Sequence, residues 1–305
     1  MEANNPFFEQ VRLLVALLPH VARQKCFALK GGTAINLFLR DMPRLSVDID
    51  LTYLPVENRE ISLAGIDSAL GTIIEDIESK IPRTNVKASV LKGTDKRFKL
   101  LVRQGDTNVK IEVTPVLRGS VYPAEFREMV PKASEAFGFS RIQLLSFEDL
   151  YAGKICAALD RQHPRDLYDV NLLLNHEGID IRLKNAFLVY LIGHNRPMAE
   201  LLAPQPQDIE PFYRRELEGM TAEPVSLKQL QNTLGRLVGE IHSRLTDVDK
   251  YFLLALKKGT ADWHDFPLPE AERLPAVQWK LLNIQRMSKT KHAAAIAKLE
   301  KVLFG

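Results

Sequence analysis

Residues 27–51 decide how the chain is interpreted. They read Phe27-Ala-Leu-Lys-Gly-Gly-Thr33-Ala-Ile-Asn-Leu-Phe-Leu39 and, after a turn at Pro43, Arg44-Leu-Ser-Val-Asp-Ile-Asp-Leu51. The apolar run 27–29 predicts a short strand that ends at the glycine pair, and 34–39 predicts a short helix for which Thr33 can supply the N-cap. Residues 46–51 alternate strictly between polar and apolar, which predicts a second strand.

Asp48 and Asp50 are predicted on one face of that second strand, because side chains two residues apart in a strand point the same way. The two carboxylates repel each other, so the pair is poor for stability but suited to sharing divalent cations such as Mg²⁺ or Mn²⁺. Two such ions about 4 Å apart stabilise the attacking and leaving oxygens of a phosphoryl transfer. Glu112, which lies between apolar residues in a further predicted strand, is the natural third metal ligand.

Each of these features also has an ordinary structural explanation. Gly-Gly-Thr is common in turns, and Asp-x-Asp is most often a solvated strand face. Their succession is more informative, because glycines and a helix N-terminus offer backbone N–H groups to a phosphate beside the carboxylates. The candidate nucleotide-binding residues are therefore Gly31, Gly32 and Thr33 with the flanking Lys30, Arg44 and Ser46. Ser46 is equally well explained as a small polar residue next to a metal site.

The two segments together resemble the signature of polymerase-beta-type nucleotidyltransferases, in which Gly-Ser precedes Asp-x-Asp. Gly-Thr in place of Gly-Ser is typical of one branch, the abortive-infection (AbiEii-type) nucleotidyltransferase toxins of bacterial toxin–antitoxin systems. A second stretch resembles the same branch: a helical Lys154, then Arg161, then Arg165-Asp166 and Asp169. The matching stretches cover roughly residues 28–52 and 146–174.

The resemblance implies catalytic roles for two residues of the second stretch. Lys154 would meet the triphosphate as a compact cation, and Asp166 would act as a base or contact the nucleotide or acceptor. The residues by themselves leave other roles open. Lys154 could extend its ammonium to water, Asp166 could compensate the dipole of its helix, and Arg165 could pair with Asp169 one turn away.

The order of predicted elements favours an α+β protein in two parts. Residues 1–140 are expected to form a polymerase-beta-like nucleotidyltransferase domain with a mixed sheet. Its elements are a helix over 7–18 that Pro19 ends or kinks, a helix over 61–80, and strands over 86–91, 97–103 and 109–113. Residues 141–305 are expected to be mostly helical, with a last helix over 277–303, and to complete the active site and bind the acceptor.

Composition is that of a globular protein. The chain has 305 residues, 46% hydrophobic and 26% charged, with a net charge of +3. Cys26 and Cys156 lie in apolar stretches without metal-ligand spacing, which indicates buried free thiols and a reducing compartment. The first six residues do not resemble a signal peptide, and no apolar run is long enough for a membrane helix. We therefore expect a cytoplasmic protein with no membrane partner.

Positive charge is concentrated at the C-terminus. The last predicted helix carries six basic residues against one acid, Glu300, and the basic residues are Lys280, Arg286, Lys289, Lys291, Lys298 and Lys301. A basic helix predicts an RNA acceptor, although a solvated surface helix explains it equally well. The family resemblance adds the 3′ end of tRNA as acceptor and an antitoxin encoded alongside.

The expected activity follows from these parts. The protein would transfer a nucleoside monophosphate from an NTP to an acceptor hydroxyl with release of pyrophosphate, and so act as a toxin. A rival of a different class is a non-catalytic module that keeps the nucleotidyltransferase shape to bind RNA or a protein. A third possibility is an enzyme that modifies a hydroxyl of a protein or of a small molecule.

Overall fold

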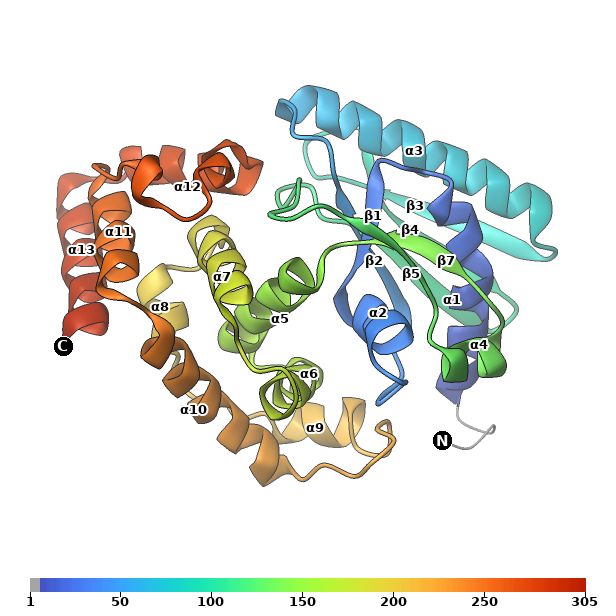
Figure 1. Ribbon diagram of the computed structural model, residues 1–305. Helices are drawn as coiled ribbons and strands as arrows, with labels where there is room; N and C mark the ends of the chain where they lie inside the picture. The colour runs from blue at the N-terminus through green and yellow to red at the C-terminus, as the bar shows by residue number, and fades with distance from the viewer. Residues whose placement is uncertain (1–5) are drawn as a thin grey trace. The chain divides into compact units, whose positions relative to one another are not determined.

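The computed structural model describes residues 6–305, and the chain divides into two compact units. Unit 1 is the chain up to Ser146 together with Gly219–Pro224, and unit 2 comprises Phe147–Glu218 and Val225–Gly305 (Figure 1). The expectation about a signal peptide falls mainly on residues 1–5, which lie outside the described residues. Among the helices of residues 6–305, none is long and apolar enough to cross a membrane.

Unit 1 is built on a mixed sheet of seven strands, which confirms the predicted α+β fold with a mixed sheet. The spatial order is β3-β4-β5-β2-β1-β7-β6, in which β2 pairs with β5 and β1 pairs with β7 in parallel while the other neighbours are antiparallel. The strands are β1 (Phe27–Lys30), β2 (Asp48–Tyr53), β3 (Thr84–Val90), β4 (Arg97–Gln104), β5 (Thr107–Val113), β6 (Glu125–Glu128) and β7 (Arg141–Leu144). The sequence did not predict β6 or β7. Because β7 belongs to this sheet, unit 1 ends at Ser146 rather than at residue 140.

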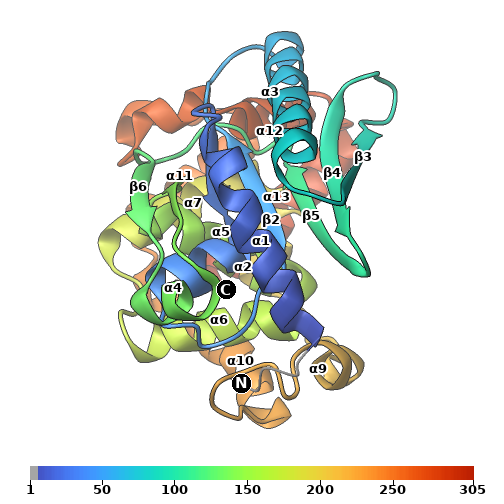
Figure 2. The same cartoon turned by 90° about the vertical axis from the view of Figure 1, so that its right-hand side faces the viewer.

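Two long helices pack against one side of this sheet, α1 (Pro6–Ala22) and α3 (Arg59–Lys80) (Figure 2). We expected Pro19 to end or kink the first helix. Pro19 does not end it, because α1 continues to Ala22. An internal proline costs about 3 kcal/mol. The fully buried Leu14, Leu17 and Leu18 offset that cost by packing in the core. A short helix α2 (Gly31–Ala34), a π-helical turn η1 (Ile35–Leu39) and α4 (Pro131–Phe137) complete the unit.

Unit 2 is mostly helical, as predicted. Its α-helices are α5 (Phe147–Arg161), α6 (Pro164–Asn175), α7 (Ile181–Gly193), α8 (Met198–Leu202), α9 (Glu210–Glu216), α10 (Leu227–Arg244), α11 (Asp247–Lys258), α12 (Pro275–Gln285) and α13 (Lys289–Phe304). Two short 3₁₀ turns, η2 (Trp263–Asp265) and η3 (Pro269–Arg273), lie between α11 and α12. Pro164 occupies the first turn of α6, where its missing N–H costs nothing.

The prediction of one final helix over 277–303 is wrong. The chain leaves the helical conformation after Gln285, and α13 begins at Lys289 behind the N-cap residue Ser288. Packing explains the break, because α12 packs on α7 whereas α13 packs on α11 and α8. One straight helix could not reach both sets of partners.

A buried ion pair links two helices of unit 2. The Nζ atom of Lys184 in α7 lies 2.6 Å from Oδ2 of Asp249 in the first turn of α11. Both side chains are almost completely buried. The same carboxylate oxygen accepts hydrogen bonds from the backbone N–H and the hydroxyl of Thr246. The backbone N–H of Asp249 donates to the Thr246 hydroxyl in return, which completes the capping box of α11. Removal of either charge would leave the other buried and unpaired.

Asp249→Ala should lower the free energy of unfolding by about 3–5 kcal/mol, because it strands the Lys184 ammonium inside unit 2. The measurement is a urea titration followed by circular dichroism. Asp247→Ala is the matched control, since Asp247 lies in the same helical turn but is solvent-exposed, and its loss should cost about 0.5 kcal/mol. Equal losses in the two variants would contradict a stabilising role for the buried pair.

Candidate active site

Four charged side chains lie on one face of the sheet where β2 meets β5. The parallel register sets Asp48 opposite Lys110 and Asp50 opposite Glu112. The alternating residue Ile49 is completely buried on the opposite face. The prediction that Asp48 and Asp50 share a face is therefore confirmed. Glu112, the expected third carboxylate, lies beside Asp50 in the neighbouring strand.

Lys110 is the member of this group that sequence reasoning missed. Its Nζ atom lies 3.3 Å from Oε2 of Glu112 and 3.8 Å from Oδ2 of Asp48. Burial alone would lower the pKa of Lys110, but the negative charges of Asp48, Asp50 and Glu112 outweigh it and raise the pKa above its usual value. The signal was present in the sequence, because Lys110 lies two residues before Glu112 and so shares its face.

The same carboxylates are an oxygen donor set of the kind that Mg²⁺ prefers. Within residues 6–305, however, no three His, Cys, Asp or Glu side chains are already gathered at metal-binding distances. The carboxylates are instead arranged around the Lys110 ammonium. The negative potential that raises the pKa of this lysine would equally attract a divalent cation, so the chemistry of the donor set fits a metal.

The glycine turn lies directly against this group. Gly31 has a left-handed backbone with φ of +74°, and a Cβ atom there would lie 2.7 Å from Oδ2 of Asp50. At Gly32, a Cβ atom would lie 2.6 Å from Nη2 of Arg44 and 2.8 Å from Oγ of Ser46. Both positions therefore require glycine for close approach, and Gly31 requires it for conformation as well. The turn thereby packs against the strand that carries the carboxylates.

Thr33 has a different role from the predicted N-cap. The helix begins at Gly31, so Thr33 lies inside α2, where it is completely buried. Its hydroxyl donates to the backbone carbonyl of Asp48 at 2.5 Å and lies 3.1 Å from Oγ of Ser46. A buried hydroxyl needs a partner, and this one finds it in the carboxylate strand rather than in its own helix. Thr33 thus ties the glycine turn to Asp48.

The remaining residues predicted to bind nucleotide differ in how deeply they are buried and in where they lie relative to the carboxylates. Lys30 pairs with Asp50 in the register of β1 and β2, and its Nζ donates to Oγ1 of Thr114 at 2.7 Å. Arg44 is only 2% exposed, and its Nη1 donates to the carbonyl of Leu45 at 2.9 Å. Ser46 is buried next to Thr33. Lys30 therefore lies on the carboxylate face, whereas Arg44 supports the glycine turn from behind.

The second motif forms a buried ion cluster between α5 and α6 in unit 2. Nζ of Lys154 lies 2.8 Å from Oδ1 of Asp166 and 3.1 Å from Oδ2 of Asp169, and Nε of Arg161 lies 2.6 Å from Oδ2 of Asp166. Lys154 is only 7% exposed, so it does not extend to water. The suggested pairing of Arg165 with Asp169 is also wrong, because Arg165 pairs with Glu216 at 2.8 Å.

Charge controls the protonation of Asp166. Burial alone would raise the pKa of this carboxyl, but the cations of Lys154 and Arg161 outweigh it and hold the pKa well below its usual range. Asp166 is therefore ionised at neutral pH. Asp166 lies in the first turn of α6, where it can compensate the helix dipole. That role does not explain its pairing with Lys154 and Arg161.

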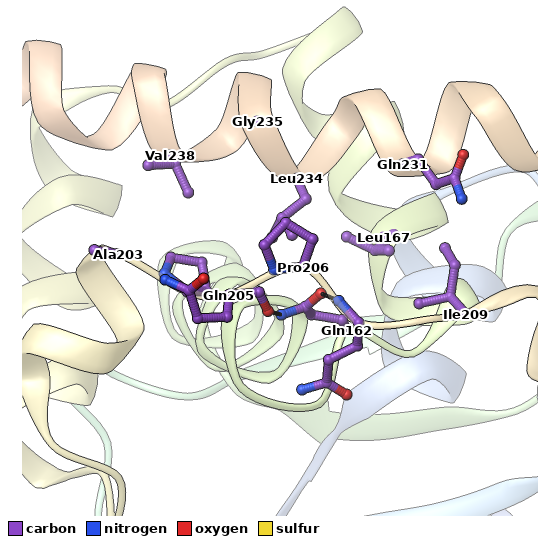
Figure 3. A pocket seen from close by; sticks show the side chains of 12 residues that line it. Gln162, Leu167, Ala203, Gln205, Pro206, Ile209, Gln231, Leu234, Gly235 and Val238 are labelled. Atoms are coloured by element: carbon purple, nitrogen blue, oxygen red, sulfur yellow. Dashed lines mark hydrogen bonds between the residues drawn. The ribbon is translucent and has the colours of Figure 1, made fainter.

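Unit 2 also contains a cavity of about 470 Å³ that none of the predicted site residues lines. It lies between α10 and the loop that contains residues 203–209, as Figure 3 shows. Gln162 holds that loop in place. Its Nε2 donates to the carbonyl of Gln205 at 2.7 Å, and its Oε1 accepts from the N–H of Gln207 at 2.9 Å. The lining is mainly apolar and carries no charged side chain, so it does not fit a triphosphate.

Gly32→Ala should lower the free energy of unfolding by about 1–3 kcal/mol, because the new methyl group overlaps the buried Arg44 and Ser46 side chains. Urea denaturation monitored by fluorescence measures this. Gly235→Ala in α10 is the control, since its methyl group meets no atom within 4 Å and should add up to about 1 kcal/mol of stability. A Gly32→Ala protein as stable as the wild type would show that Arg44 and Ser46 move aside readily.

Lys154→Met should lower the free energy of unfolding by about 3–5 kcal/mol at neutral pH, because two buried carboxylates lose their shared cation. Arg161→Met removes the exposed cation from the same cluster and should cost less than about 1 kcal/mol. The folded-state pKa of Asp166 lies below its unfolded value of about 3.9.

The stability contributed by Lys154 is therefore complete above about pH 5 and declines as pH falls below about 4. Urea titrations of wild type and Lys154→Met across this range should show a difference that narrows with acidification. A difference that stays constant with pH would contradict an electrostatic origin.

Comparison with known proteins places these features in a family. The model of the nucleotidyl transferase AbiEii toxin of type IV toxin–antitoxin systems matches residues 12–282. Among solved structures, MenT4, a nucleotidyltransferase toxin from Mycobacterium tuberculosis H37Rv, shares the fold with a TM-score of 0.60 at 15% identity, over 97% of this chain and 95% of that one. A search of curated proteins gave no match. Because the family model spans both the carboxylate strand and the α5–α6 motif, the chain belongs to the AbiEii family of nucleotidyltransferase toxins.

Proposed function

We propose that this toxin transfers a nucleoside monophosphate from an NTP to a hydroxyl of an RNA acceptor, with the 3′ end of tRNA as the favoured site. The observation that carries the proposal is the arrangement of Asp48, Asp50 and Glu112 on one sheet face around the Lys110 ammonium, next to the glycine turn. A like-charge group of this kind is unfavourable unless it binds cations, so its best explanation is a metal-assisted phosphoryl transfer.

The reaction exchanges a phosphoanhydride bond of the NTP for a phosphoester bond to the acceptor. A bond forms between the acceptor oxygen and the α-phosphorus, and the bond from the α-phosphorus to the oxygen that bridges to the β-phosphate breaks. Pyrophosphate leaves, and the hydroxyl proton passes to a carboxylate or to water. Asp48, Asp50 and Glu112 would hold Mg²⁺, or Mn²⁺ in its place. The bound metal would stabilise the attacking and leaving oxygens.

The chain's own residues would position the donor nucleotide. The glycine turn contacts Asp50, so phosphates bound to its backbone N–H groups would lie beside the carboxylates. Lys30 lies on the carboxylate face and supplies a positive charge there. Thr33 and Ser46 would act indirectly, because they hold the turn and the strand together. The buried Arg44 would likewise support the turn.

Lys154 and Asp166 are proposed to serve the nucleotide or the acceptor, as the family resemblance implies. Their burial supports this, because a buried ion cluster is often no more stable than an apolar replacement and its presence points to a functional role. Reaction on tRNA would take place in the cytoplasm, where the two free cysteines stay reduced. An antitoxin encoded alongside would restrain the activity.

The decisive experiment incubates the protein with Mg²⁺, total tRNA and each of the four labelled NTPs in turn. Wild type should label RNA with one or more NTPs. Asp48→Asn should lower the rate at least about 100-fold, because it removes several kcal/mol of transition-state stabilisation through the metal. Asp41→Asn is the control, an exposed acid of the same unit that should leave the rate unchanged.

Other outcomes identify the rivals. Label on protein in place of RNA would make a protein hydroxyl the acceptor. Absence of label from every substrate, with growth arrest intact in the Asp48→Asn variant, would leave the non-catalytic binding module as the explanation.

A further inference from the structure

The face that carries the carboxylates continues across two more strands. Next to β5, the register sets Lys99 of β4 opposite Glu112, and Leu101 opposite Lys110. Next to β4, Lys87 of β3 lies opposite Leu101. Because directly paired residues share a face, these side chains extend the surface on which Asp48 and Asp50 lie.

This extension is basic. The sequences of β3 and β4 contain no acidic residue, and on the carboxylate face they carry Lys87, Lys99 and Arg103, which we term the open-face patch. Within residues 6–305, neither Lys87 nor Lys99 forms an ion pair. Arg103 is 63% exposed. Its Nε donates to the backbone carbonyl of Gly105 at 2.8 Å, and its Nη2 lies 3.9 Å from the fully exposed Asp106, a separation at which the ion pair contributes little.

The patch is uncovered and partly apolar. On the reverse face, Leu100 and Val102 are completely buried, because α3 packs against β3 and β4 there (Figure 2). On the patch side, Leu101 remains 41% exposed between the cations. A leucine amid cations suits a ligand that has both phosphates and sugar or base surfaces, such as a polynucleotide, better than it suits a small anion.

The spacing also fits a polymer that ends at the carboxylates. Neighbouring strands lie about 4.8 Å apart, and the order is β3-β4-β5-β2. The cations of β4 therefore lie about 10 Å, and that of β3 about 14 Å, from the strand that bears Asp48 and Asp50. A chain held by the patch can place its terminus at the site of transfer.

Part of the basic C-terminus, which the sequence suggested as an RNA-binding surface, is already engaged in contacts within unit 2. The Nζ atom of Lys280 donates to the backbone carbonyls of His194 and Arg196 at 2.6 and 3.1 Å. Lys298 pairs with Glu200 at 2.9 Å. Two of the six predicted cations thus serve contacts within unit 2.

We propose that the open-face patch binds the sugar-phosphate backbone of a single-stranded RNA acceptor and directs its terminal hydroxyl toward Asp48 and Asp50. The inference rests on the proposed function, because it assigns a docking surface to the acceptor of that reaction. Lys87, Lys99 and Arg103 contact phosphates, and Leu101 contacts a sugar or base.

The test compares two double variants that lose the same charge, Lys87→Gln/Arg103→Gln in the patch and Lys289→Gln/Lys291→Gln in α13. Lys99 is left intact because it lies beside Glu112. Binding of fluorescent tRNA is measured by anisotropy without NTP, between about 50 and 200 mM salt. Thermal unfolding checks that both variants fold, and Lys87→Arg/Arg103→Lys tests whether positive charge alone is sufficient.

The patch variant should bind RNA more weakly, and the slope of log affinity against log salt should fall by about 1.4, from about 0.7 for each phosphate contact to single-stranded RNA. Over the fourfold rise in salt, wild-type affinity should then fall about sevenfold more than that of the variant. The α13 variant and the charge-preserving variant should keep the wild-type slope.

Three results would overturn the proposal: an unchanged slope in the patch variant, an equal or greater change in the α13 variant, or a matching loss of labelled NTP binding in the patch variant. The last would assign the cations to the triphosphate. The proposed function is judged separately, by transfer of label to RNA by the wild type. A protein that binds RNA through the patch but transfers no label would refute the reaction and leave the docking surface intact.

Discussion

Repulsion among three carboxylates on two adjacent strands is the constraint on which the rest of unit 1 depends. Asp48, Asp50 and Glu112 would push β2 and β5 apart if the strands had nothing else to hold them. The parallel hydrogen-bond ladder and the buried Ile49 and Ile111 on the reverse face hold them together. Lys110 supplies a positive charge on the carboxylate face itself. The negative potential that attracts the Lys110 ammonium would attract a divalent metal ion more strongly.

The second component of the site is the glycine turn, whose backbone closely approaches the strand that carries the carboxylates. Glycine at positions 31 and 32 allows the turn after β1 to contact Asp50, Arg44 and Ser46. The hydroxyl of Thr33 then bonds to the carbonyl of Asp48, so the turn and the strand move as one. Contact between turn and carboxylates is what a triphosphate bridged by metal requires, because its phosphates and its metal lie within a few ångströms of each other.

Unit 2 contains two buried ion groups that differ in composition. The Lys184–Asp249 pair is one cation with one carboxylate, completed by a capping box, and it joins α7 to α11. The Lys154 group has two carboxylates that share one buried cation, with Arg161 at its exposed edge. In the Lys184–Asp249 pair each charge is balanced by the other, and the pair has an architectural role. The Lys154 group keeps one cation, that of Arg161, at the solvent edge beside two buried carboxylates, which suits a functional role.

Local periodicity by itself determined the central feature of this protein. The strict alternation over residues 46–51 placed Asp48 and Asp50 on one face and Ile49 in the core, and the same reasoning applied to β5 identified Glu112. What depends on pairing between distant segments was decided only by the tertiary structure. The role of Lys110 requires the parallel register of β2 and β5, and the partner of Thr33 is a carbonyl fifteen residues away. The division of the last helix follows from packing against α7 on one side and α11 on the other. A sequence pattern records which face of an element is apolar, but register and packing partners are set by free-energy differences summed over the whole fold, and so they appear only once the chain has folded.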